Sequence, residues 1–234
     1  MDVLSGFLAY SVALSLIHGS VNVEETTTSN AATANAGMAV NGRSGSMNTI
    51  YGPTGLIVVP TAYVTADNHV NFSASFANEL RGPAVNWAVI PGVEVGGAFI
   101  DREGADNKLI GNAKINIIPK NFDFFEVGIG VIDAADAINQ TFYFVGSAEL
   151  NVPRVAEERA IGFRVHAGAG TGLFKEKLFG GAELVFDERF SVVGEWDTKN
   201  FNAALKYVHD SGFRIQLGFH HTNLYLGATY GLRF

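Results

Sequence analysis

The sequence contains no cysteine, which excludes disulfide bonds, thiolate metal sites and cysteine nucleophiles. Charged residues are also scarce, because they make up 17% of the chain against about 25% in a typical soluble domain. After the N-terminal residues there is no run of about 20 apolar residues, which rules out a bundle of membrane-spanning helices. Nevertheless 47% of the residues are hydrophobic. These residues must follow some pattern other than long continuous segments.

That pattern is clearest at the C-terminus, where Asn223–Phe234 alternates between apolar residues and polar or small ones. Successive side chains of a β-strand point to opposite faces, so this strand would have one continuous apolar face. A tilted strand of this length matches the hydrocarbon layer of a membrane. The alternative is the last strand of a soluble β-sandwich. The segment resembles the closing strand of bacterial outer-membrane barrels, and that resemblance implies an assembly signal formed by Tyr230, Leu232 and Phe234.

The alternation recurs in about twelve segments from His69 onward, separated by short turns rich in Gly, Asn, Asp and Pro. These links leave no room for crossover helices, which excludes α/β folds and indicates sequential antiparallel strands. The second face carries few charges, whereas the outer faces of a sandwich would carry more. We therefore predict an all-β fold, a transmembrane antiparallel up-and-down β-barrel of about 12 strands in the bacterial outer membrane. The predicted strands are 69–78, 83–90, 92–101, 108–118, 122–133, 140–151, 160–171, 178–187, 189–197, 199–210, 212–221 and 223–234.

Three regions are predicted along the chain. Residues 1–20 include an apolar segment with the length of a signal-peptide core, although no Lys or Arg precedes it. We interpret them as a signal peptide, and the alternative is a mis-assigned start or a helix packed elsewhere. Residues 21–50 are rich in Ser, Thr, Asn and Ala, which predicts a flexible linker. Residues 51–234 form the predicted barrel.

One segment before the first strand does not alternate. It has the sequence Gly-Leu-Ile-x-x-Pro-Thr-Ala, and a short Asp-containing gap and an alternating strand follow it. This arrangement resembles the start of YjbH-like outer-membrane proteins, which are linked to exopolysaccharide production and secretion. Since Pro suits a central strand poorly, we expect the segment to line the periplasmic mouth of the barrel or to enter its lumen. The residues that carry the resemblance are Gly55, Leu56, Ile57, Pro60, Thr61 and Ala62.

The polar face of the predicted strands carries five acidic and five basic residues, so their charges nearly cancel. An unpaired charge in a narrow interior costs several kcal/mol, and these residues are expected to have partners. They form either a structural network of salt bridges that fills the barrel or a charged constriction that selects a solute. The predicted lumen residues are Glu94, Lys114, Glu126, Glu149, Arg164, Glu183, Glu195, Lys206, Arg214 and Arg233.

The remaining motifs favour neither catalysis nor a cofactor. Barrel phospholipases resemble one another in a His-x-Ser arrangement, and here it occurs only at His18–Ser20 in the predicted leader, so no enzyme activity is predicted. His166 and His220 lie on the lumen face with His221 beside them, but no metal-binding spacing accompanies them, and no metal is predicted. A net charge of −7 argues against nucleic acid.

Three functions remain open for such a barrel. The YjbH-like resemblance implies a conduit or structural component for export or anchoring of an extracellular polymer. The alternatives are a plugged membrane anchor or scaffold that binds envelope partners, and a small-solute porin. The expected partners are the lipid bilayer of the outer membrane, the barrel-insertion machinery, and other envelope proteins or a polysaccharide.

Overall fold

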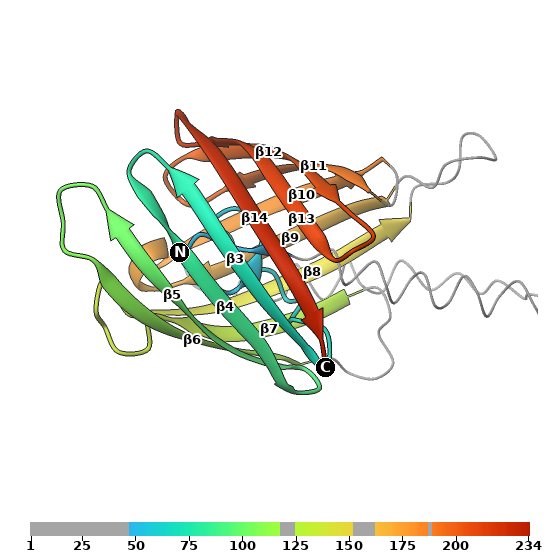
Figure 1. Cartoon of the computed structure of the whole chain (residues 1–234), viewed down its shortest axis with the longest axis horizontal. Helices are drawn as coiled ribbons and strands as arrows, with labels where there is room; N and C mark the ends of the chain where they lie inside the picture. The colour runs from blue at the N-terminus through green and yellow to red at the C-terminus, as the bar shows by residue number, and fades with distance from the viewer. Residues whose placement is uncertain (1–46, 118–124, 152–161, 187–188) are drawn as a thin grey trace, which may run out of the picture. The chain divides into compact units, whose positions relative to one another are not determined.

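A computed structural model of the chain describes residues 47–117, 125–151, 162–186 and 189–234, which belong to one compact unit. The predicted signal peptide and most of the predicted linker lie outside these residues. Twelve antiparallel strands, β3 to β14, form a closed barrel in which the last strand pairs with the first (Figure 1). The predicted fold class and strand number are therefore confirmed. No helix in the described part of the chain is long and apolar enough to cross a membrane.

The described strand boundaries lie within about three residues of the predicted ones, because short turns interrupt the alternation at clear positions. Each strand pairs with its sequence neighbours, as in an up-and-down barrel. A short 3-10 helix, η2 (Gly172–Phe174), lies in the turn after β9. The barrel strands are β3 (His69–Ala77), β4 (Leu80–Ile90), β5 (Val93–Arg102), β6 (Lys108–Asn116), β7 (Phe125–Ile132), β8 (Thr141–Asn151), β9 (Gly162–Gly170), β10 (Lys177–Val185), β11 (Phe190–Trp196), β12 (Phe201–Val208), β13 (Phe213–His220) and β14 (Asn223–Arg233).

The outer surface of the barrel is apolar along the middle of the strands. Neighbouring strands place large hydrophobic side chains there in register, as Leu205, Leu217 and Leu226 show, each 41–51% exposed. Exposed charged residues of the described strands lie near strand ends, as Arg81 and Lys177 do. A soluble barrel would not expose such a continuous apolar band, whereas a lipid-facing barrel requires one.

The interior of the barrel has two unlike halves. The first barrel strand, β3, starts at His69, and the last, β14, ends at Arg233. These two residues pair with each other at one end of the barrel, which we call the chain-terminal end. Nine of the ten predicted lumen charges come from the strand halves nearer this end, and Glu195 near the end of β11 is the exception. In the opposite halves the inward positions are largely apolar. Buried members of this apolar half include Leu80, Ile100, Ile110, Ile132, Tyr143, Phe179 and Tyr225.

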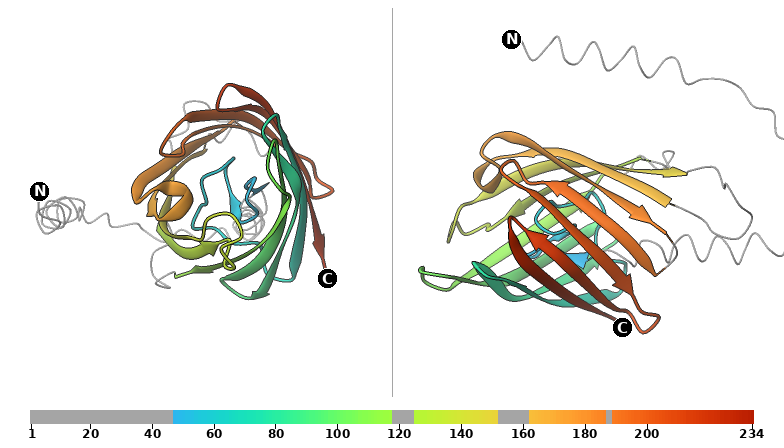
Figure 2. Two further views of the ribbon diagram at one scale, coloured as in Figure 1. Left: turned by 90° about the vertical axis from the view of Figure 1, so that its left-hand side faces the viewer. Right: turned by 90° about the horizontal axis from the view of Figure 1, so that it is seen from above.

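Residues 47–65 lie inside the barrel rather than in its wall, and we call this segment the plug (Figure 2). It contains the short paired strands β1 (Met47–Asn48) and β2 (Thr54–Gly55). Nearly all of its residues are buried, and none of them is charged. The sequence assigns residues 47–50 to the flexible linker, but the structure buries all four within the barrel, which corrects that boundary. For the Pro60 segment, we expected a place either along the periplasmic mouth or inside the lumen. The structure places it inside the lumen.

Candidate functional site

The plug is a compact hairpin held by its own backbone hydrogen bonds. The Ile50 N–H donates to the Ile57 carbonyl at 2.8 Å, and the Leu56 N–H donates to the Val59 carbonyl at 2.9 Å. Gly55 lies so close to Pro60 that a Cβ at position 55 would be 2.9 Å from the Pro60 Cα atom. Only glycine allows this approach of two backbone segments. The close approach of the two backbone segments therefore explains the glycine of the motif.

The tip of the hairpin is bound by one carboxylate of the barrel wall. Glu195 in β11 accepts hydrogen bonds from the backbone N–H groups of Ile57, Val58 and Val59, at 2.9, 2.8 and 3.1 Å. The Asn202 side chain donates a further bond to it at 2.9 Å. No cation contacts Glu195 among the described residues, so backbone dipoles stabilise the buried charge. Charge-assisted bonds of this kind are about twice as strong as neutral ones.

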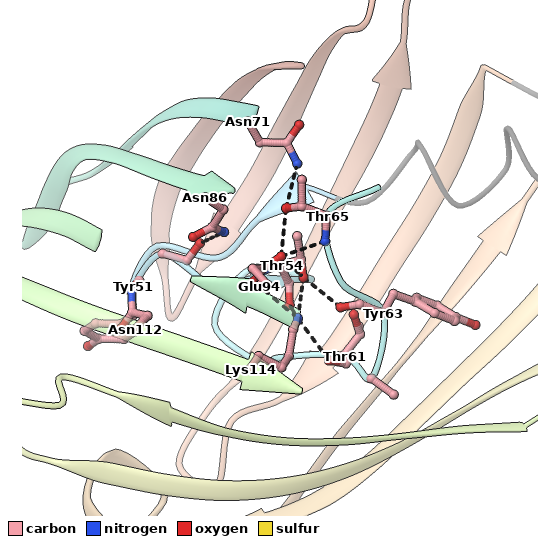
Figure 3. A network of polar contacts seen from close by, with 12 residues as sticks. Tyr51, Thr54, Thr61, Tyr63, Thr65, Asn71, Asn86, Glu94, Asn112 and Lys114 are labelled. Carbon is pink, nitrogen blue, oxygen red and sulfur yellow. Dashed lines mark hydrogen bonds and ion pairs between the residues drawn. The ribbon is translucent and has the colours of Figure 1, made fainter. Parts of the chain in front are cut away.

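A second attachment lies nearer the chain-terminal end, where Glu94 and Lys114 project from adjacent strands (Figure 3). Their charged atoms are 3.6 Å apart and both side chains are buried. Glu94 accepts the N–H groups of Thr54 and Thr65 at 3.0 and 2.7 Å. Lys114 donates to the carbonyls of Thr54 and Thr61 at 2.8 and 3.3 Å. The ion pair thus binds donors and acceptors of the plug backbone together.

Neutral side chains of the wall bind the rest of the plug backbone. Asn112 donates to the carbonyl of Tyr51 at 2.8 Å, and Asn86 donates to that of Gly52 (Figure 3). On the far side, the Ala62 N–H donates to Ser147 Oγ at 2.9 Å. Ser147 Oγ lies 2.8 Å from Nδ1 of His166, which fixes the orientation of the hydroxyl. The Ser–His pair therefore serves as an attachment point for the plug.

Apolar packing completes the plug. The hairpin side chains of Leu56, Ile57, Val58 and Val59 belong to one buried hydrophobic cluster that also includes wall residues of the apolar half. Burying an aliphatic side chain of this size contributes about 1.5–3 kcal/mol. The apolar inward face of the wall therefore has a partner inside the molecule. A water-filled lumen would offer none.

Other predicted lumen charges form a separate group on β8 to β12. Glu183 contacts Arg164 at 3.4 Å and also pairs with Lys206, while Ser191 donates to it at 2.6 Å. Glu149 lies 3.5 Å from Arg164 but its side chain is 47% exposed. These residues are not among the groups that bind the plug.

The structure does not bring all ten predicted charges into one network. Glu126 is buried and accepts a hydrogen bond from the Asn116 amide, and Arg214 is buried 3.5 Å from the Asn71 side-chain oxygen. Arg233 is exposed at the end of β14. Two groups stand out among the ten charges. Three of them bind the plug, namely Glu94, Lys114 and Glu195. Four form a cluster in the wall, namely Glu149, Arg164, Glu183 and Lys206.

The other predicted residues lie as follows. Tyr230, Leu232 and Phe234 are exposed on the outer surface, between 41 and 69%, and their role in assembly stays a prediction. The residues that carry the family resemblance are all in the plug. Sequence reasoning missed the wall residues that bind it, such as Asn86, Asn112 and Ser147. In the alternating pattern these residues fall on the inward face, which was the one available signal. Neutral polar residues on that face are also expected in a water-filled lumen that binds nothing.

Comparisons with known proteins give a structural likeness but no match in sequence. No family model matches the sequence, and no curated protein does, so the YjbH-like resemblance has no support beyond the residues quoted for it. Among solved structures, the chain is similar to one described as "KdgM porin", with a TM-score of 0.45 and 12% sequence identity. The match covers 71% of this chain and 99% of that one.

Proposed function

We propose that the chain is an outer-membrane channel of the porin type whose lumen is restricted by the plug. The continuous apolar surface along the strand middles supports a place in a lipid bilayer. A closed barrel has no free strand edges, so it satisfies its backbone in lipid without further partners. The outer membrane is the membrane in which such barrels are found in bacteria.

The observation that carries the channel proposal is how the plug is attached. Among the described residues, no backbone–backbone hydrogen bond joins residues 47–65 to a barrel strand. The plug pairs with itself, and side chains of the wall hold it. It can therefore leave or shift without unpairing any strand of the barrel.

Conductance in planar bilayers tests this proposal. The unmodified protein should pass little or no current, and a variant that lacks residues 47–64 should pass a large and steady one. Glu195→Gln should give intermittent openings, because it weakens the tip attachment. Glu149→Gln is the matched control, since that carboxylate is exposed and does not bind the plug. A large steady current through the unmodified protein would contradict restriction by the plug.

A sealed scaffold is the second candidate, and the near-complete burial of the plug favours it. If both the unmodified protein and the variant without the plug stay silent, the scaffold replaces the channel. Export of an extracellular polymer, which the YjbH-like resemblance implies, would need the same lumen. That role too would require displacement of the plug.

A further inference from the structure

Three residues with metal-binding side chains meet at the end of the barrel opposite the chain-terminal end. Asp197 directly follows β11, His220 is the last residue of β13, and His221 begins the next turn. One potential ligand atom from each lies within 4.8 Å of the other two. Asp197 and the two histidines lie more than 20 positions apart in the sequence, which explains why no spacing motif marks them.

The carboxylate of Asp197 is held firmly in place. Its Oδ1 atom accepts the backbone N–H groups of Lys199 and Asn200, at 2.9 and 2.8 Å. Its Oδ2 atom accepts a bond from the Asn202 amide at 3.1 Å and lies 3.6 Å from Nε2 of His221. One carboxylate oxygen therefore faces the imidazoles with its orientation already fixed. Such outer contacts orient the ligands of metal sites.

The two histidines are arranged as a pair. Their rings stack with centroids 4.0 Å apart and an interplanar angle of 26°. His221 has a positive φ of 58°, and its backbone N–H donates to the Asn202 side-chain oxygen at 2.7 Å. His220 is buried, and neither of its ring nitrogens forms a hydrogen bond within the described part of the chain. The ring nitrogens of His220 are not engaged by another of the described protein groups, so they are available to ligate a metal ion.

We propose that Asp197, His220 and His221 bind a divalent transition-metal ion, with Zn²⁺ as the best fit. Imidazole and carboxylate ligands suit Zn²⁺, whereas Mg²⁺ and Ca²⁺ prefer oxygen alone. Bonds of about 2.0–2.2 Å place the ligands of a tetrahedral ion roughly 3.4 Å apart, which small side-chain rotations would achieve from this arrangement. Three protein ligands leave the fourth position to water or a solute.

This site is separate from the plug and does not rest on the proposed channel function. One residue nevertheless connects the two, because the Asn202 amide donates to both Asp197 and Glu195. The same side chain also accepts the His221 N–H group. Metal binding would therefore restrain the part of the wall that holds the plug tip.

Isothermal titration of the full-length, detergent-purified protein with ZnCl₂ tests the site. We expect one Zn²⁺ per chain, with no displacement by excess Mg²⁺, and a melting temperature that rises with Zn²⁺ concentration. His221→Asn should weaken binding at least about 100-fold, and Asn tolerates the positive φ at this position. His220→Gln should weaken it to the same degree.

His209→Gln is the matched control, because this exposed histidine lies in a turn at the other end of the barrel. It should leave Zn²⁺ affinity unchanged. Heat-modifiable migration on gels verifies that each variant forms the barrel. The proposal is overturned if the folded unmodified protein binds no Zn²⁺, or if all the histidine variants bind it equally well.

Discussion

At the residue scale, the buried carboxylate of Glu195 is the clearest case of a charge that serves a structural contact. An ionised carboxylate away from water is strongly unfavourable unless hydrogen bonds replace the lost solvent. Here three successive backbone N–H groups and one amide do so. Those N–H groups lie in a tight turn and would otherwise be unsatisfied inside the barrel. Each partner therefore needs the other, and this mutual dependence fixes the position of the plug tip.

Glu195→Gln tests that dependence with almost no change of volume. A glutamine amide is uncharged and has only one oxygen to accept hydrogen bonds. Its NH₂ group would face at least one N–H donor of the plug, so that hydrogen bond is lost. We expect a loss of about 2–5 kcal/mol in the free energy of unfolding, measured by denaturant titration in detergent. Glu149→Gln should change it by less than about 0.5 kcal/mol, because that side chain is about half exposed and does not contact the plug. Equal effects of the two substitutions would show that Glu195 does not hold the tip.

At the scale of the elements, strands and plug differ in what determines them. A barrel strand is specified by its own alternation, so its face and boundaries could be predicted from residues within it. The plug is specified by distant partners: its tip hydrogen bonds join residues 136 to 138 positions apart. No local pattern encodes such a contact. The sequence could therefore predict the barrel and the unusual Pro60 segment, but not the wall residues that bind it.

The division of the interior into charged and apolar halves was also accessible in principle. Ile100, Ile110 and Tyr143 share the parity of charged residues on their own or neighbouring strands. In the alternating pattern alone, these apolar residues look like exceptions to the rule that inward-facing residues are polar. They make sense once an apolar hairpin packs against them. Single-residue alternation thus describes the wall well and gives little information about what fills it.

A charge placed on the outer face tests the membrane-facing surface. Leu217 lies mid-strand in β13 and Leu224 lies near the start of β14, and both point outward. Leu217→Arg should destabilise the barrel in a bilayer by about 2–4 kcal/mol, whereas Leu224→Arg should cost about 0–1 kcal/mol. Unfolding in lipid vesicles measures both. Equal and small losses would mean that the mid-strand surface does not face hydrocarbon.

At the scale of the whole molecule, barrel and plug form one unit in which the wall provides what the plug lacks. The plug brings no charge of its own, and the wall supplies carboxylates, an ammonium group and amides to its backbone. Elsewhere in the wall, Glu183 pairs with Arg164 and Lys206. In the proposed channel, the sheet stays paired while the plug, which side chains hold, is the part that moves.

The position of the plug inside the barrel is the central claim, and a designed disulfide tests it most directly. The native chain has no cysteine, so a pair introduced by mutation has no competitors. Ser147 Oγ of β8 lies 2.9 Å from the Ala62 backbone nitrogen, which keeps the Cα atoms of the two residues within disulfide range. Ala62→Cys with Ser147→Cys should therefore cross-link on mild oxidation of the folded protein in membranes.

The control pairs Ala62→Cys with Phe144→Cys, on the same strand, whose side chain is 50% exposed on the outer face. Intact-mass measurement and non-reducing gels report the cross-link. Our account predicts a disulfide in the first protein and free thiols in the second. Free thiols in both, or equal cross-linking in both, would show that residues 47–65 do not occupy the lumen.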